Sequence, residues 1–182
     1  MLKLFQIDLK NLSLSTTYKF DYLLDNDFFR QIDGPEVGKG KVNVSLSVVR
    51  FSSIFEFNFY INGVVTVDCD RCLEEMEIPI ETKNRLVVTF GDRYAETSDE
   101  QVTVSEEEGF INIAWYLYEF IALSIPMKHI HKPGDCNEVM ASKLSAHIVD
   151  ELMETDASTE SEADSRTTDP RWDMLRNLMK DN

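Results

Sequence analysis

The sequence predicts an α+β fold in which a largely antiparallel, curved β-sheet carries packed helices. Two runs of alternating apolar and polar residues, 41–50 and 54–67, predict long strands, because residues two apart in a strand share one face. Over 112–124 the apolar residues change to helical spacing. An acidic segment follows further along the chain, and it predicts a flexible linker before a C-terminal helix.

Length and composition suit one ordinary domain with a tail. The chain has 182 residues, 43% of them hydrophobic, which is enough to build a core. No apolar run is long enough to span a bilayer, and the first residues differ from a signal peptide. With three cysteines and no export signal, we expect a reduced cytoplasmic protein. The predicted parts are a domain over 1–154, an acidic linker over 155–168 and a helix over 169–182.

The net charge of −15 argues against a broad phosphate-binding surface, since Lys and Arg supply most non-specific nucleic-acid affinity. The negative charge is concentrated between Asp150 and Asp169, where Arg166 is the only basic residue. The rest of the chain is therefore less acidic than the total suggests. A local patch on it remains open to RNA or to a basic protein.

The N-terminal half is expected to be mostly strand. Residues 1–8 alternate and predict a first strand, while apolar residues at helical intervals over 20–29 predict a short helix. The runs 41–50 and 54–67 should pair as an antiparallel hairpin with one wet face, in which Gly63 marks a bulge or bend. Residues 76–80, 85–90 and 101–105 are expected to continue the sheet.

Helices are expected after the sheet. Asn112 is the candidate N-cap of the helix over 112–124, whose apolar side chains predict that it lies across the sheet. Helical spacing returns over 138–154. At the end of the chain, Asp169 as N-cap and Pro170 at the first helical position predict another helix start.

Cys69 and Cys72 lie between two predicted strands. A turn there lets two thiolates face one point, as half of a zinc site requires. A redox pair usually begins a helix that follows a strand, and the glutamates at 74, 75 and 77 should raise the thiol pKa values rather than lower them. The third interpretation is two unliganded cysteines at a sheet edge.

The basic loop over 127–136 carries the remaining cysteine. Cys136 with His131 or His129 would bring four soft or borderline ligands to one tetrahedral ion, and the alternative is a loop that binds no metal. The predicted zinc ligands are Cys69, Cys72, His131 and Cys136. The same loop is also a candidate for phosphate contacts, against the alternative of a solvated loop.

No catalytic pattern is present, because the sequence lacks Gly-x-Ser-x-Gly, Gly-x-x-x-x-Gly-Lys and His-Glu-x-x-His. We therefore expect neither an enzyme nor a small-molecule substrate.

Four stretches of the sequence are distinctive when taken together: Gly-Val-Val-Thr-Val-Asp-Cys-Asp-Arg-Cys-Leu at 63–73, Leu-Val-Val-Thr-Phe-Gly at 86–91, the run 113–126 and Asp-Pro-Arg-Trp at 169–172. In these stretches the chain resembles the YceD family of large ribosomal RNA subunit accumulation proteins. These stretches follow the family's order over most of the chain. The length, acidic character and Asp-Pro-Arg tail resemble the Bacteroidota branch.

This resemblance implies a cytoplasmic, non-catalytic factor needed for 23S rRNA accumulation and so for large-subunit biogenesis. Its partner would be rRNA or an assembly intermediate. Cys69 and Cys72 correspond to the family's signature pair, with Arg71 between them. Many relatives have a second cysteine pair in the C-terminal half, where this chain has Cys136 alone.

The basic residues at the motif loops are the expected partner contacts: Arg71, Lys128, His129, Lys132 and Arg171. No membrane contact is expected. Two other classes remain. One is a structural zinc or scaffold module that binds only a basic ribosomal protein, which the charge of −15 would suit. The other is a thiol-redox protein, which requires a lowered thiol pKa at Cys69 or Cys72.

Overall fold

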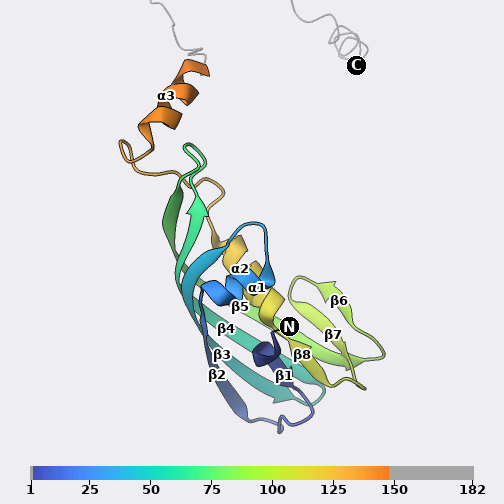
Figure 1. Ribbon diagram of the computed structural model, residues 1–182. Helices are drawn as coiled ribbons and strands as arrows, with labels where there is room; N and C mark the ends of the chain where they lie inside the picture. The colour runs from blue at the N-terminus through green and yellow to red at the C-terminus, as the bar shows by residue number, and fades with distance from the viewer. Residues whose placement is uncertain (1, 148–182) are drawn as a thin grey trace, which may run out of the picture. The chain divides into compact units, whose positions relative to one another are not determined.

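The computed structural model describes residues 2–147 and confirms the predicted α+β class (Figure 1). In chain order the elements are η1 (Lys3–Phe5), β1 (Gln6–Asp8), β2 (Thr17–Leu24), α1 (Asn26–Ile32), β3 (Lys39–Phe51), β4 (Ile54–Asp68), β5 (Glu75–Gly91), β6 (Ala95–Ser98), β7 (Gln101–Ser105), β8 (Phe110–Asn112), α2 (Ala114–Ser124) and α3 (Glu138–His147). A six-stranded sheet has the order β2-β3-β4-β5-β7-β6, and β1 pairs with β8 in a second sheet. These pairings are antiparallel except that of β5 with β7, so the sheet is largely antiparallel.

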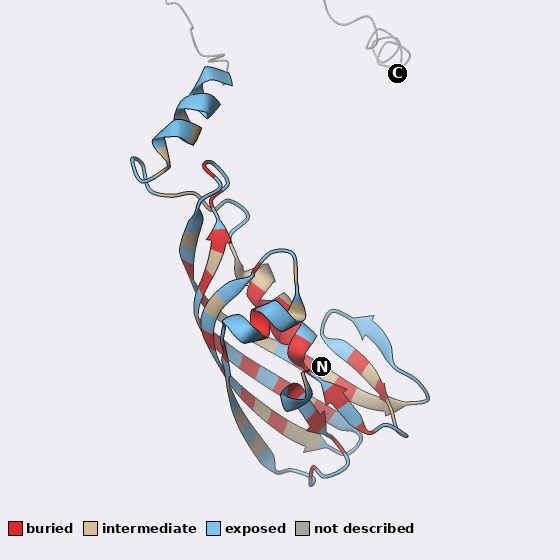
Figure 2. Cartoon of the chain, viewed as in Figure 1, coloured by how far each residue is buried: buried red, intermediate tan, exposed pale blue. Residues whose placement is uncertain are grey.

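Three long strands, β3, β4 and β5, form the centre of the six-stranded sheet. Along β4 the buried residues Phe55, Phe57, Phe59 and Ile61 alternate with more exposed ones, as the banding of the strands in Figure 2 shows. The predicted hairpin of β3 with β4 is confirmed. The two strands predicted at 76–80 and 85–90 are one strand, β5, because β4 gives it an uninterrupted partner from Ile54 to Asp68.

Gly63 is not a bulge. It pairs with Val42 on one side and Ile80 on the other, and the register continues through it without a shift. A Cβ at this position would lie 2.3 Å from the carbonyl oxygen of Lys41 and 2.6 Å from the Cα of Val42. Glycine is therefore needed here because the backbone of β3 approaches closely.

The N-terminal strand is shorter than predicted. Only Gln6–Asp8 pairs as a strand, since Lys3–Phe5 forms a 3₁₀ turn. The short strands β6 and β8 were not predicted either. Strands of three or four residues show too little alternation to be recognised from the sequence.

The helix predicted over 20–29 is wrong in its first half. Residues 17–24 form the strand β2, and α1 begins only at Asn26. The apolar residues at 20, 22 and 24 also fit the period of a strand, and pairing with β3 decides between the two periods. The helix starts where it does because the Asp25 carboxylate accepts hydrogen bonds from two amides of the first turn.

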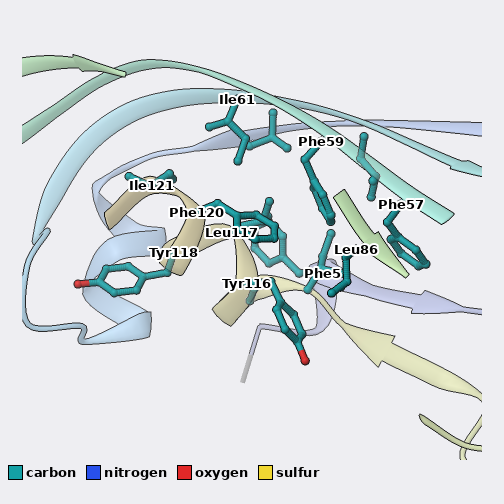
Figure 3. Close-up of a cluster of buried hydrophobic side chains, with 14 of the residues drawn as sticks. Phe5, Phe57, Phe59, Ile61, Leu86, Tyr116, Leu117, Tyr118, Phe120 and Ile121 are labelled. Carbon is teal, nitrogen blue, oxygen red and sulfur yellow. The ribbon is translucent and has the colours of Figure 1, made fainter. Parts of the chain in front are cut away.

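The helix α2 lies across the sheet, as predicted, and its apolar side chains meet those of β4 (Figure 3). The ring centroids of Phe120 and Phe59 are 5.3 Å apart, and Leu117 and Ile121 are fully buried. The predicted capping residue is displaced by one position. The side chain of Asn112 accepts a hydrogen bond from the first turn, but the residue at the N-cap position is the next one.

The helix α3 has no buried residue and appears pale blue throughout most of its length in Figure 2. Because α3 runs from Glu138 to His147, the helix predicted over 138–154 is confirmed as far as His147. The rest of that helix, the linker over 155–168, the helix over 169–182 and Arg171 lie outside the described residues. Within residues 2–147, no helix is both long and apolar enough to cross a bilayer.

Candidate metal centre

The turn between β4 and β5 brings Cys69 and Cys72 together. The N–H of Cys69 donates to the carbonyl oxygen of Glu74, and the N–H of Leu73 donates to the carbonyl oxygen of Cys69, both at 2.9 Å. Leu73 adopts a left-handed conformation with φ of 62°, which reverses the chain within a few residues. Both cysteines are buried. The predicted turn between two strands is confirmed.

The loop that follows α2 brings two further ligands to this turn. His131 Nδ1 lies 3.3 Å from Cys72 Sγ, and the N–H of His131 points to Cys69 Sγ at 3.4 Å. The ligand atoms of Cys69, Cys72, His131 and Cys136 all lie within 4.8 Å of one another. The structure therefore gathers the four residues that the sequence predicted, and it selects His131 over His129.

The size and chemistry of this cluster are compatible with zinc. Around a tetrahedral zinc ion, bond lengths of about 2.0–2.3 Å place neighbouring ligand atoms about 3.4–3.8 Å apart. Three sulfurs and one imidazole nitrogen are a ligand set that zinc accepts in structural sites. Because four protein ligands fill a tetrahedral ion, such a site leaves no open position for a substrate.

Backbone N–H groups lower the pKa of the Cys69 thiol. Burial alone would raise that pKa, but N–H groups of His131, Arg71 and Cys72 stabilise the thiolate and lower the pKa to about 6. The expectation that the glutamates at 74, 75 and 77 raise this pKa is wrong, because the N–H groups at the sulfur outweigh burial and lower it.

The pKa of Cys72 is also lowered, chiefly by the N–H of Glu74 and, against the effect of burial, by the N–H of Asn137. Cys136 behaves in the opposite way, since burial and the neighbouring sulfurs raise its pKa to about 11. The pKa of His131 is raised, first by its contact with Cys72. With Cys69 and Cys72 as thiolates, Cys136 therefore stays protonated unless a bound cation offsets a third negative charge.

A lowered thiol pKa suits a redox pair as well as a metal ligand. The two uses differ in whether further ligand side chains lie beside the two sulfurs. A redox pair needs no further ligand, whereas here an imidazole and a third thiol converge on the pair from a distant segment. This convergence favours the metal site.

Asp70 fastens the loop to the turn, a role that sequence analysis missed. Its N–H donates to the carbonyl oxygen of His129 at 2.9 Å, and its carboxylate accepts the N–H of His129 at 2.7 Å. The ring of His129 also faces this carboxylate, with 3.4 Å between Nε2 and Oδ1. The sequence offered only the position of Asp70 between two cysteines, because its partner lies 59 residues away.

Asn137 fixes the chain directly after Cys136. Its side-chain oxygen accepts N–H groups of Val139 and Met140, which start α3, and its side-chain nitrogen donates to Glu74 at 2.6 Å. The last ligand is thereby held between the β4–β5 turn and the helix.

The predicted partner contacts are distributed around the cluster. Arg71, Lys128 and Lys132 are exposed on the turn and the loop. His129 is half-buried and its ring is engaged with Asp70. The roles of these residues in binding a partner remain predictions.

Comparison with known protein families gives one match. The family described as large ribosomal RNA subunit accumulation protein YceD matches residues 57–179, which is more than half of the chain. The matched range includes the β4–β5 turn, α2 and all four ligands of the cluster. No curated protein and no solved structure matches the chain.

Proposed function

The chain belongs to the YceD family of large ribosomal RNA subunit accumulation proteins, and on that basis we propose that it is a non-catalytic factor in large ribosomal subunit biogenesis. It supports the accumulation of 23S rRNA in the cytoplasm by binding rRNA or an assembly intermediate, and it uses no small-molecule substrate. The family description supports a role in the accumulation of large-subunit rRNA.

The observation that carries the mechanism is the convergence of the four ligands from two distant segments. One zinc ion held by Cys69, Cys72, His131 and Cys136 would fasten the loop over 127–136 against the β4–β5 turn. Arg71 lies between two of these ligands and Lys132 lies next to a third. A structural zinc would therefore place cationic side chains from both segments at one end of the sheet.

We define the basic end as Arg71, Lys128 and Lys132. All three are exposed, and among residues 2–147 none of them takes part in an ion pair. Lys and Arg beside a hydrogen-bonding loop are the groups that position a protein on phosphates. We include His129 and Arg171 as further contacts, the latter on its sequence position alone.

Three of the neighbouring carboxylates at this end are engaged within the protein. The carboxylate of Asp70 binds His129, that of Glu74 accepts the side chain of Asn137, and that of Glu75 pairs with Lys39. Lys39 thus compensates the charge of Glu75, whereas the neutral Asn137 amide holds Glu74 in place without compensating its charge. The compensation of Glu75 lowers the local repulsion of a phosphate, despite the net charge of −15.

Sedimentation of the protein in a cell extract tests the proposal. On a sucrose gradient at low salt, the wild-type protein should travel with precursors of the large subunit and dissociate at high salt. The variant Arg71→Glu/Lys128→Glu should remain at the top of the gradient. The variant Lys19→Glu/Lys41→Glu makes the same charge change on β2 and β3 and should sediment like the wild type. If the wild type stays at the top at every salt concentration, direct binding to the particle is refuted.

A second candidate, a module that binds only a basic ribosomal protein, is supported by the acidic total charge. Purified partners distinguish the two. A salt-sensitive complex with a ribosomal protein but not with 23S rRNA would favour the second candidate. Binding of rRNA that Arg71→Glu/Lys128→Glu abolishes would favour the first.

A further inference from the structure

A groove of about 560 Å³ runs between the middle of β5 and the C-terminal half of α2. Its apolar wall consists of Phe59, Phe120 and Leu123, and Leu123 is 83% exposed. The opposite wall is the stretch 83–85 of β5. A large apolar side chain held this far out on a rigid helix, beside a hollow, is an available anchor for a partner.

The wall formed by β5 is an open strand edge. Among the described residues, β5 has a neighbour on this side only from Val87 onward, where β7 runs parallel to it. The N–H of Val87 donates to the carbonyl oxygen of Glu100 at 2.7 Å. Since backbone groups of a strand face the same side every second residue, those of Arg85 and Lys83 face the open edge. An extended segment in the groove can therefore continue the line of β7 and pair with β5.

A second hollow of about 370 Å³ adjoins the groove and shares Asp99, Phe120 and Leu123 with it. Its walls are apolar at Val102 and aromatic at Tyr116. Three carboxylates line it, those of Glu96, Asp99 and Glu119. Apolar walls with carboxylates beside them fit a Lys or Arg side chain, whose stem is apolar and whose head is cationic.

Two of these carboxylates are held in place by neutral donors. Glu119 accepts the indole N–H of Trp115 at 2.6 Å, and Glu96 accepts the hydroxyl of Tyr94. Among residues 2–147, none of Glu96, Asp99, Glu100 and Glu119 forms an ion pair. By contrast, the Arg85 side chain in the groove wall is paired with Glu56, and Lys83 lies over the ring of Tyr60. Lys83 keeps its positive charge in this contact, but the four carboxylates outnumber it, so the net charge of the groove and the adjoining hollow is negative.

We propose that this groove binds an extended, basic segment of a protein partner. The segment adds to the open edge of β5, places an apolar side chain against Phe120 and Leu123, and inserts a Lys or Arg side chain between Glu96, Asp99 and Glu119. The chain's own stretch from Asp150 to Asp169 is a poor match, because it is itself acidic. This surface does not include the basic end, so the inference does not rest on the rRNA contact proposed above.

Titration of the ¹⁵N-labelled full-length protein with a synthetic peptide tests the inference. The probe is Lys-Val-Arg-Val-Lys-Leu-Arg with blocked ends, and its counterpart has Glu in place of every Lys and Arg. The basic peptide should shift the amide signals of 81–86 and 119–124, and the acidic one should not. Shifts confined to other regions, or binding of both peptides alike, would overturn the inference.

Two variants with matched controls locate the contact. Leu123→Glu should weaken binding of the basic peptide at least about tenfold, while Leu14→Glu, also at an exposed leucine, should leave it unchanged. Asp99→Arg/Glu100→Arg should weaken it by a similar factor and should allow the acidic peptide to bind, whereas Glu106→Arg/Glu107→Arg in the β7–β8 turn should do neither. Circular dichroism verifies that each variant is folded.

Other occupants of the groove would give different results. If an RNA oligonucleotide shifts the groove amides and the basic peptide does not, the partner class is wrong. If the protein self-associates with rising concentration and Leu123→Glu alone abolishes this, the groove is a contact between copies and the inference fails. Unchanged peptide binding in both groove variants would refute it as well.

Discussion

Replacing His131 by alanine should release zinc, whereas replacing His129 by alanine should not. The two histidines are two residues apart in one loop, yet their rings have different surroundings. His131 Nδ1 lies 3.3 Å from Cys72 Sγ, while His129 Nδ1 lies 3.1 Å from the carbonyl oxygen of Pro126 and Nε2 faces Asp70. The pair therefore separates the proposed metal ligand from a histidine whose ring is engaged by Pro126 and Asp70 instead.

The size of the effect follows from the length of chain that the ion closes. Cys72 and His131 are 59 residues apart, and a cross-link over such a loop stabilises the fold by roughly 4 kcal/mol, because it restricts the unfolded chain. At about 2–4 °C per kcal/mol for a chain of this size, His131→Ala should lower Tm by about 8–16 °C. His129→Ala loses side-chain contacts worth about 1 kcal/mol and should lower Tm by about 2–4 °C.

The assay measures bound zinc by mass spectrometry after dialysis against a weak chelator, together with thermal unfolding by circular dichroism. The wild type and His129→Ala should retain one zinc per chain, and His131→Ala should retain much less. Equal zinc content in both variants would refute the assignment of the ligand. Loss of zinc with an unchanged Tm would refute the argument from loop closure.

Three further outcomes follow from the fold and the cluster. In urea unfolding, Gly63→Ala should lower the free energy of unfolding by about 1–3 kcal/mol, because the new Cβ would meet the β3 backbone. The control Gly38→Ala has open space around its Cβ and should change that free energy by less than about 0.5 kcal/mol. Tyr118→Phe should cost about 1–3 kcal/mol by the same measurement, since its hydroxyl oxygen accepts two backbone N–H groups at 2.8 and 3.2 Å; a cost near zero would show that water replaces it. In metal-free protein, the thiolate of Cys69 should persist down to about pH 6 and disappear below it, because its pKa is lowered, while Cys136 with a pKa of about 11 should stay protonated. The ultraviolet absorbance of the thiolate, titrated in the wild type and in Cys69→Ser, should therefore show a step near pH 6 that the variant lacks, and added zinc should shift this step to lower pH.

Local patterns in the sequence determined the elements whose periodicity is long and unambiguous. The strands β3 and β4 and the helix α2 were predicted because each has enough residues for its period to be recognised. The turn with Cys69 and Cys72 followed from these elements, since a Cys-x-x-Cys between two strands has few other places to lie. The family resemblance, which the comparison confirmed, rests partly on the same stretches, namely the end of β4 with the turn and the helix α2.

Tertiary contacts decided what the local patterns left open. The apolar residues of β2 fit a helix or a strand, and only pairing with β3 selected the strand. Strand β7 was predicted, but its parallel pairing with β5, which leaves the edge of β5 open beside α2, was not. The sequence named His131 and His129 as alternative ligands. The hydrogen bonds between Asp70 and His129 hold the loop so that the ring of His131 lies beside the cysteines. In each case the deciding contact joins residues far apart in the chain, and periodicity along a segment carries no information about such contacts.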